Sequence, residues 1–284
     1  MNLGPCEIFE VGPRDGLQNE AREIPVAEKV ALVDCLSEAG FSRIECASFV
    51  SPKWVPQMAG SAEVLAGIKR ADGVRYAALA PNMQGYEAAV AAGADEIAIF
   101  ASASEGFSKK NINASIAEAF ERFAPILEEA RHVDIPVRGY VSCVVECPYD
   151  GKVAPSAVAA VADRLFSMGC YEISLGDTIG AGTPDSIARM LLAVRDVVPV
   201  GRLAGHYHDT HGRAMANIDA SLSMGVRVFD AAVGGLGGCP FAPGAAGNVA
   251  TEAVNKHLVA LGYQTGVDQA VVDKAAEMAR AMRG

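Results

Sequence analysis

The sequence predicts an α/β protein folded as a (β/α)8 TIM barrel. Short apolar segments alternate with longer segments whose apolar residues recur at helical spacing. The alternation repeats over about 260 residues at a spacing near 30 residues, which is typical of strand–helix units in a closed parallel sheet. The competing architecture is an open doubly wound sheet. The G-x-G-x-x-G turn that such a sheet carries after its first strand is absent from the sequence.

The predicted strands are short apolar runs, and a helical segment follows each of them. We expect strands at residues 6–11, 43–47, 75–79, 96–101, 137–143, 172–175, 203–208 and 228–233. We expect helices at residues 26–39, 57–70, 83–92, 116–131, 156–168, 184–197, 214–224 and 248–261. Several of these helices are followed directly by a glycine, the usual helix stop, at Gly40, Gly93, Gly169 and Gly225.

A further amphipathic segment at residues 268–282 predicts an additional C-terminal helix. Because no low-complexity tract or Pro/Ser-rich linker interrupts the chain, we expect a single catalytic domain over residues 1–284, with residues 266–284 as a helical extension. This helix is either a subunit interface or a cover for the base of the barrel. A homo-oligomer therefore stays open as an alternative.

Composition excludes several classes of protein. The net charge of −10 makes the chain a poor candidate for binding nucleic acid or an anionic membrane. No apolar run approaches the roughly 18–20 residues of a membrane span, and the N-terminus lacks a basic-then-apolar signal. The seven cysteines are scattered, which favours reduced thiols over a disulfide framework. We therefore expect a cytoplasmic protein and the whole gene product.

Two histidines lie at the end of the predicted strand at residues 203–208. Residues two apart on a strand point to the same side, so we expect His206 and His208 to point together and Asp209 to point elsewhere. Two imidazoles on one face are half of a divalent-metal site. The alternative is a pair of unrelated polar residues at a strand exit.

The carboxyl ends of the other predicted strands decide between these interpretations, because active sites of such barrels lie there. These ends carry carboxylates, an arginine, amides, a lysine and thiols: Arg14, Asp15, Gln18, Glu45, Lys53, Asn111, Cys143, Cys147, Asp177, Cys239 and Asn248. Structural strand ends do not require so many ionisable groups, since unpaired charge near a barrel axis is costly. The convergence therefore favours a metal site at the histidine pair.

Several long motifs resemble the hydroxymethylglutaryl-CoA lyase family within the metal-dependent acyl-CoA lyase and Claisen-type synthase superfamily. They are residues 11–20 (VGPRDGLQNE), 48–58 (SFVSPKWVPQM), 175–180 (LGDTIG), 206–210 (HYHDT) and 234–240 (GGLGGCP). The resemblance extends to about Gly266. It implies cleavage of 3-hydroxy-3-methylglutaryl-CoA to acetyl-CoA and acetoacetate with Mg2+ or Mn2+, as in leucine breakdown and ketone-body formation. An acyl-CoA is then the small-molecule partner.

The resemblance also implies roles for individual residues. Asp15, His206, His208 and Asn248 are the implied metal ligands. Arg14 is expected to face the thioester oxygen and Cys239 to act as general acid. Asp177 is expected either to orient the metal site or to be the base for the hydroxyl, and His206 is the other candidate for the base. Glu45 is expected to orient Arg14. The expected substrate-binding residues are Arg14, Gln18, Lys53 and Asn111.

Each role has a structural alternative. Arg14 could only hold its loop through a salt bridge, Cys239 could be a small buried apolar residue, and Asp177 could only cap the turn that follows it. Lys109 and Lys110 are equally consistent with CoA phosphate contacts and with a solvated face. The chain departs from the family pattern where Ala21 and Arg22 follow Gln-Asn-Glu and where His211 follows His-Asp-Thr.

Other functions are open at this point. A Schiff-base aldolase needs a lysine inside the barrel, and only Lys53 and Lys152 lie just beyond strand ends. A condensing synthase of the same superfamily usually carries a long C-terminal regulatory region, which this chain lacks. A barrel that acts only as a binding scaffold has no reason to keep the polar rim. A lyase for a longer 3-hydroxy-3-alkylglutaryl-CoA is the alternative we keep.

Overall fold

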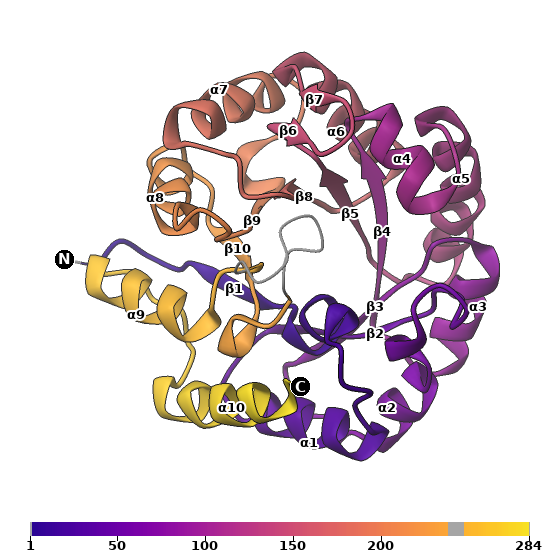
Figure 1. Cartoon of the computed structure of the whole chain (residues 1–284), viewed down its shortest axis with the longest axis vertical. Helices are drawn as coiled ribbons and strands as arrows, with labels where there is room; N and C mark the ends of the chain where they lie inside the picture. Colours follow the sequence, from indigo (N-terminus) through magenta and orange to yellow (C-terminus); the bar gives the residue numbers. More distant parts are fainter. Residues whose placement is uncertain (1, 238–246, 284) are drawn as a thin grey trace.

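A computed structural model describes residues 2–237 and 247–283 and confirms the predicted barrel. Eight parallel strands close into a ring in the order β1-β10-β9-β8-β5-β4-β3-β2 (Figure 1). Their bounds are β1 (Glu7–Glu10), β2 (Arg43–Ser48), β3 (Arg75–Leu79), β4 (Glu96–Ser102), β5 (Val137–Ser142), β8 (Glu172–Asp177), β9 (Leu203–Tyr207) and β10 (Val228–Ala231). The first and last strands of the chain are therefore neighbours.

Helices surround this ring, as Figure 1 shows. They are α1 (Val26–Ser37), α2 (Ser61–Gly67), α3 (Met83–Ala91), α4 (Glu105–Ile112), α5 (Ile116–His132), α6 (Pro155–Met168), α7 (Pro184–Arg195), α8 (Ala214–Ser223), α9 (Thr251–Leu261) and α10 (Gln269–Met282). Among the described residues, every helix is too short or too polar to span a lipid bilayer.

Two helical segments differ from the sequence-based expectation. The predicted helix at 57–70 is split into a short 3-10 turn, η3 (Pro56–Met58), and α2, because Gly60 between them adopts a left-handed backbone with φ of 79°. Helix α4 was not predicted. It is short, and its N-terminus is fixed by Ser104, whose side chain accepts a hydrogen bond from the N–H of Phe107. A hairpin of β6 (Glu146–Cys147) and β7 (Gly151–Lys152) was also not predicted.

Helix α10 packs its apolar face on its own chain, against α1 and the 3-10 turn η5 (Val233–Gly235). Its buried face consists of Val272, Ala275, Ala276, Ala279 and Met282. Asp268 begins the helix by accepting hydrogen bonds from the N–H groups of Ala270 and Val271. Figure 1 shows α10 beside α1 on the outside of the ring.

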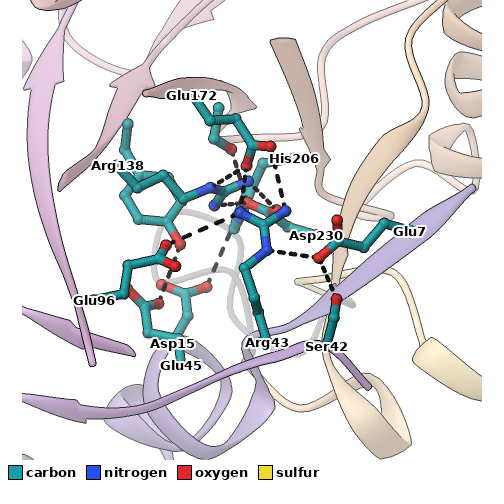
Figure 2. Close-up of polar contacts among 12 residues, drawn as sticks. Glu7, Asp15, Ser42, Arg43, Glu45, Glu96, Arg138, Glu172, His206 and Asp230 are labelled. Carbon is teal, nitrogen blue, oxygen red and sulfur yellow. Dashed lines mark hydrogen bonds and ion pairs between the residues drawn. The ribbon is translucent and has the colours of Figure 1, made fainter. Parts of the chain in front are cut away.

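The interior of the barrel is charged, whereas most such barrels fill it with branched apolar residues. Arg43 and Arg138 are fully buried there, and each donates hydrogen bonds to Glu172 (Figure 2). Both guanidinium groups also contact the ring of Phe9, whose centroid lies 4.8 Å from Cζ of Arg43 and 4.4 Å from Cζ of Arg138. Arg138 also forms a two-pronged ion pair with Asp230, at 3.0 and 2.7 Å. Pairing of this kind is what makes buried charges tolerable.

Candidate metal centre and active site

His206 and His208 face the same side, as the strand periodicity predicts. His206 is the penultimate residue of β9, His208 follows the strand, and their ring centroids are 5.6 Å apart. Nε2 of His206 lies 3.8 Å from Oδ2 of Asp15. One ligand atom from each of Asp15, His206 and His208 lies within 4.8 Å of the other two. The structure therefore brings together three of the four residues expected as metal ligands in one cluster.

A tight turn after β1 places Asp15 beside the histidines. The turn η1 (Gly12–Gly16) forms because the carbonyl of Val11 accepts hydrogen bonds from the N–H groups of Arg14, Asp15 and Gly16, at 3.2, 2.8 and 3.2 Å. These contacts hold Arg14 and Asp15 side by side at the carboxyl end of the barrel, where Nη1 of Arg14 lies 2.7 Å from Oδ1 of Asp15.

Asn248, the fourth residue expected as a ligand, lies beside Asp15 although it follows the last strand of the barrel. Its Nδ2 donates to Oδ2 of Asp15 at 2.7 Å, and His208 and Asn248 form an isolated backbone bridge. Gly237 must lie close to this amide, since a Cβ there would meet Nδ2 of Asn248 at 2.9 Å, and its φ is 92°. A side chain at position 237 would therefore displace Asn248.

The donor set suits a divalent cation. In the described part of the chain, Nδ1 of His208 is buried and has no hydrogen-bond partner. Burial and the neighbouring His206 lower the pKa of His208 to about 4, so this ring is neutral at neutral pH. Burial opposes ionisation of Asp15, but Arg14 and His206 outweigh it and lower the pKa of Asp15 to about 2. A carboxylate, imidazole nitrogens and an amide oxygen are ligands that Mg2+ and Mn2+ accept.

Arg14 is held by two carboxylates and is only 5% exposed. Its Nε donates to Oε2 of Glu45 at 2.6 Å, on the side opposite to its contact with Asp15. Glu45 is the inward-facing acid of β2, and it also accepts from the hydroxyl of Tyr140 at 3.2 Å. Burial raises the pKa of Glu45, although the charge of Arg14 opposes this effect. The guanidinium is thus fixed in a site that excludes most water.

Asp177 ends β8 and is buried, but it makes no hydrogen bond or ion pair with Asp15, His206 or His208 among the described residues. Its Oδ2 accepts from the N–H of Gly182 at 2.8 Å, so it does cap the following turn. Its Oδ1 is buried and has no partner within residues 2–237 and 247–283. Burial raises the pKa of this carboxyl to about 6.

Some of the residues expected to bind substrate lie at the metal cluster, and others lie on the exposed surface. Gln18 donates to Oδ1 of Asp15 at 3.1 Å and so lies at the cluster. Lys53 and Asn111 are exposed, and Asn111 lies near the end of α4. Lys53 and Lys152 are both exposed, so neither provides the buried amine that a Schiff-base aldolase requires. Cys239 lies outside the described residues.

The residues beneath the cluster were not predicted from the sequence. Asp230 on β10 lies next to His206 on β9 in the strand register, and its Oδ2 is 3.0 Å from Nδ1 of His206. Arg138 and Ser174 hold the same carboxylate. A signal was present, since a lone acid in the apolar run VFDAAV had no assigned partner. Finding that partner requires the register between strands.

Fold and site together define a (β/α)8-barrel protein with a candidate divalent-metal centre at the carboxyl ends of its strands. A family model described as HMGL-like matches residues 6–279, so the chain belongs to the HMGL-like family and the resemblance is confirmed. A 3-hydroxy-3-isohexenylglutaryl-CoA/hydroxy-methylglutaryl-CoA lyase from Pseudomonas aeruginosa is 60% identical over 275 residues, which are 96% of this chain and 92% of that protein.

Solved structures agree with this assignment. The HMG-CoA lyase from Brucella melitensis is 61% identical, has a TM-score of 0.98 and covers 99% of both chains. An HMG-CoA lyase from Acinetobacter baumannii in complex with coenzyme A and 3-methylmalate is 36% identical, with a TM-score of 0.93. That match covers 98% of this chain and 91% of the other.

Proposed function

We propose that this protein is a hydroxymethylglutaryl-CoA lyase, which cleaves 3-hydroxy-3-methylglutaryl-CoA to acetyl-CoA and acetoacetate. The observation that carries the proposal is the cluster of Asp15, His206 and His208 beside a buried Arg14, in a chain 60% identical to a lyase named for this substrate. The whole chain would be one catalytic domain. We propose the cytoplasm as its compartment and leucine breakdown as its setting.

Asp15, His206, His208 and the amide oxygen of Asn248 would hold the divalent cation, Mg2+ or Mn2+. When bound, the cation would hold oxygens of the substrate and make its tertiary hydroxyl more acidic. The reaction then removes the hydroxyl proton and breaks the adjacent carbon–carbon bond. The electron pair moves to the thioester half as an enolate, and a proton added to its carbon gives acetyl-CoA.

Arg14 would stabilise the enolate oxygen. Its guanidinium keeps its charge in a dry site, and Glu45 and Asp15 fix its direction before the substrate arrives. Preorganised charge of this kind contributes roughly 3–4 kcal/mol to a transition state per donor. Glu45 is then a positioning residue for Arg14.

We favour Asp177 over His206 as the base for the hydroxyl. Nδ1 of His206 contacts Asp230 and Nε2 faces Asp15, so both ring nitrogens are already engaged. Asp177 has one carboxylate oxygen without a hydrogen bond in the part of the chain described, and its pKa near 6 suits proton transfer near neutral pH. Cys239 would donate its thiol proton to the enolate carbon. Gln18, Lys53 and Asn111 would contact the substrate.

One assay tests the proposal. Purified protein is incubated with Mg2+ and 3-hydroxy-3-methylglutaryl-CoA, and acetoacetate and free acetyl-CoA are measured together. We expect both products in equal amounts, and no product after removal of divalent ions by a chelator. Failure to form acetoacetate with either Mg2+ or Mn2+ would contradict the proposal.

A second candidate substrate is a longer 3-hydroxy-3-alkylglutaryl-CoA. The relative from Pseudomonas aeruginosa carries an isohexenyl substrate in its name, and Ala21 and Arg22 replace the lysine usual after Gln-Asn-Glu. The values of kcat/KM for the methyl and the isohexenyl substrate decide between them. A ratio far above one for the longer chain would make it the preferred substrate.

A further inference from the structure

Asp230 is a buried carboxylate directly behind the metal cluster, and it has no role in the reaction proposed above. It lies on β10, next to His206 of β9 in the register. Asp230 is only 3% exposed. Its Oδ2 lies 3.0 Å from Nδ1 of His206. Figure 2 shows both side chains converging in the barrel interior.

Every hydrogen bond to Asp230 requires it to accept. Oδ1 accepts from Nη2 of Arg138 at 2.7 Å, while Oδ2 accepts from Nη1 of Arg138 at 3.0 Å and from the hydroxyl of Ser174 at 2.7 Å. A carboxylate held in this way has no proton to donate. Nδ1 of His206 must therefore carry the hydrogen, which leaves the lone pair of the neutral ring on Nε2.

The second histidine differs from the first. Nδ1 of His208 has no hydrogen-bond partner in the described part of the chain, so no carboxylate fixes its ring. Asp230, which contacts His206, is in turn held by charged residues deeper in the barrel. Nε of Arg138 donates to Glu172 at 2.6 Å, and Glu172 accepts from Arg43 at 3.0 Å. The ring of His206 is thereby tied through rigid strands to the base of the barrel.

We infer that Asp230, held by Arg138, is the positioning residue that fixes the tautomer and direction of His206 so that Nε2 faces the metal. The inference rests on the proposed metal site. A carboxylate behind a ligating imidazole raises the basicity of the ligand and prevents the ring from presenting an N–H to the cation. Asp230 touches neither substrate nor metal in this role.

The first experiment reads the tautomer directly. In the metal-free full-length protein labelled with 15N-histidine, at a pH where imidazole is neutral, the His206 signals are identified by their loss in His206→Gln. We expect the pattern of an Nδ1–H ring. In Asp230→Ala the ring should shift toward the Nε2–H form, which is the intrinsically favoured one. An Nε2–H ring in the parent protein would overturn the inference.

The second experiment measures Mn2+ affinity by calorimetry in the absence of substrate. Asp230→Asn keeps the shape but removes the charge, and Mn2+ affinity should fall by about tenfold to a hundredfold, the usual effect of a residue that supports a ligand. Ser37→Ala is the control. It removes a buried hydroxyl that bonds Val33 and Tyr76 instead of Asp230, and this variant should bind Mn2+ as the parent does.

Loss of Asp230 leaves Arg138 without its main partner, so folding needs its own check. The double variant Arg138→Met/Asp230→Ala removes both charges, a change that buried pairs often tolerate. If it unfolds cooperatively, it should show the same tautomer shift and the same weakened Mn2+ binding. Parent-like affinity in Asp230→Asn would overturn the positioning role alone. Absence of Mn2+ binding in the parent would overturn the metal site and this role together.

Discussion

Asn248 donates a hydrogen bond of 2.7 Å to Asp15, although 233 positions separate them in the sequence. Asp15 follows the first strand of the barrel and Asn248 follows the last. The contact exists because β1 and β10 pair side by side and close the ring. The proposed metal site is therefore a product of barrel closure, and a partly folded chain would lack it.

The ligand assignment predicts that His208→Ala loses metal but not stability. Nδ1 of His208 has no partner among the described residues, so truncation leaves no buried group unsatisfied there. Mn2+ affinity should fall by at least about a hundredfold, the upper end of what a mere supporting residue would cause. His211→Ala, an exposed histidine three positions on, is the control and should bind normally. Equal Mn2+ affinity in His208→Ala and the parent would refute the assignment.

Replacement of Arg14 should slow chemistry more than binding. Arg14→Gln should lower kcat by about a hundredfold or more with little change in KM, because the charge is needed where the enolate forms. Arg70→Gln, which breaks an exposed pair with Asp95, should keep full activity. A large rise in KM with unchanged kcat would make Arg14 a binding residue. Arg14→Gln/Glu45→Gln tests folding, since Glu45 is then not left charged and unpaired.

If Asp177 is the base, its ionisation should determine how kcat/KM depends on pH below neutrality. Burial raises its pKa to about 6, with Arg213 and His211 opposing the shift. Only the ionised form can take a proton, so kcat/KM should rise with pH and level off above about 6. Asp177→Asn should lower the rate by about a hundredfold or more and lose this rise. An unchanged profile in Asp177→Asn would return the role of base to His206.

Glu10 predicts a pH dependence of folding stability. Burial raises its pKa from 4.5 to about 7, against hydrogen bonds from Thr251, Val233 and Gly12. At a pH between 4.5 and about 7, the Glu10 carboxyl is ionised in the unfolded chain but protonated in the folded chain. The contribution of Glu10 is fully present below pH 4.5 and is lost as pH rises through about 7. Denaturant midpoints of the parent and Glu10→Gln, measured across this window, should converge at low pH and separate above it. Parallel curves would contradict the shift.

Cys239 predicts a thiol-dependent step. Cys239→Ser makes a much poorer acid than a thiol with a pKa of about 8.5, so turnover should fall by about a hundredfold. Thiol reagents should inactivate the protein, and bound substrate should protect it. Cys35→Ala, on α1, is the control. Full activity of Cys239→Ser would mean that another group supplies the proton.

Much of the barrel could be predicted from local pattern, because each strand is an apolar run and glycines close several helices. Helix α4 was not predicted, because its eight residues include few apolar positions and so show little helical periodicity. Asp15, His206 and His208 could be placed at one rim by topology alone. The contact of Asp230 with His206 could not, since it depends on which residues of β9 and β10 lie opposite each other.

The charged barrel interior has a consequence for how this sequence can change. Arg43, Glu172, Arg138 and Asp230 come from different strands and neutralise one another out of reach of water. Replacing one of these residues leaves its partner as an unpaired buried charge, which destabilises the fold. Replacing a cation and its anion together leaves no unpaired charge. Tolerated replacements at these positions should therefore arrive as coupled pairs. A library that varies Arg138 and Asp230 jointly should recover folded proteins that the two single-site libraries miss.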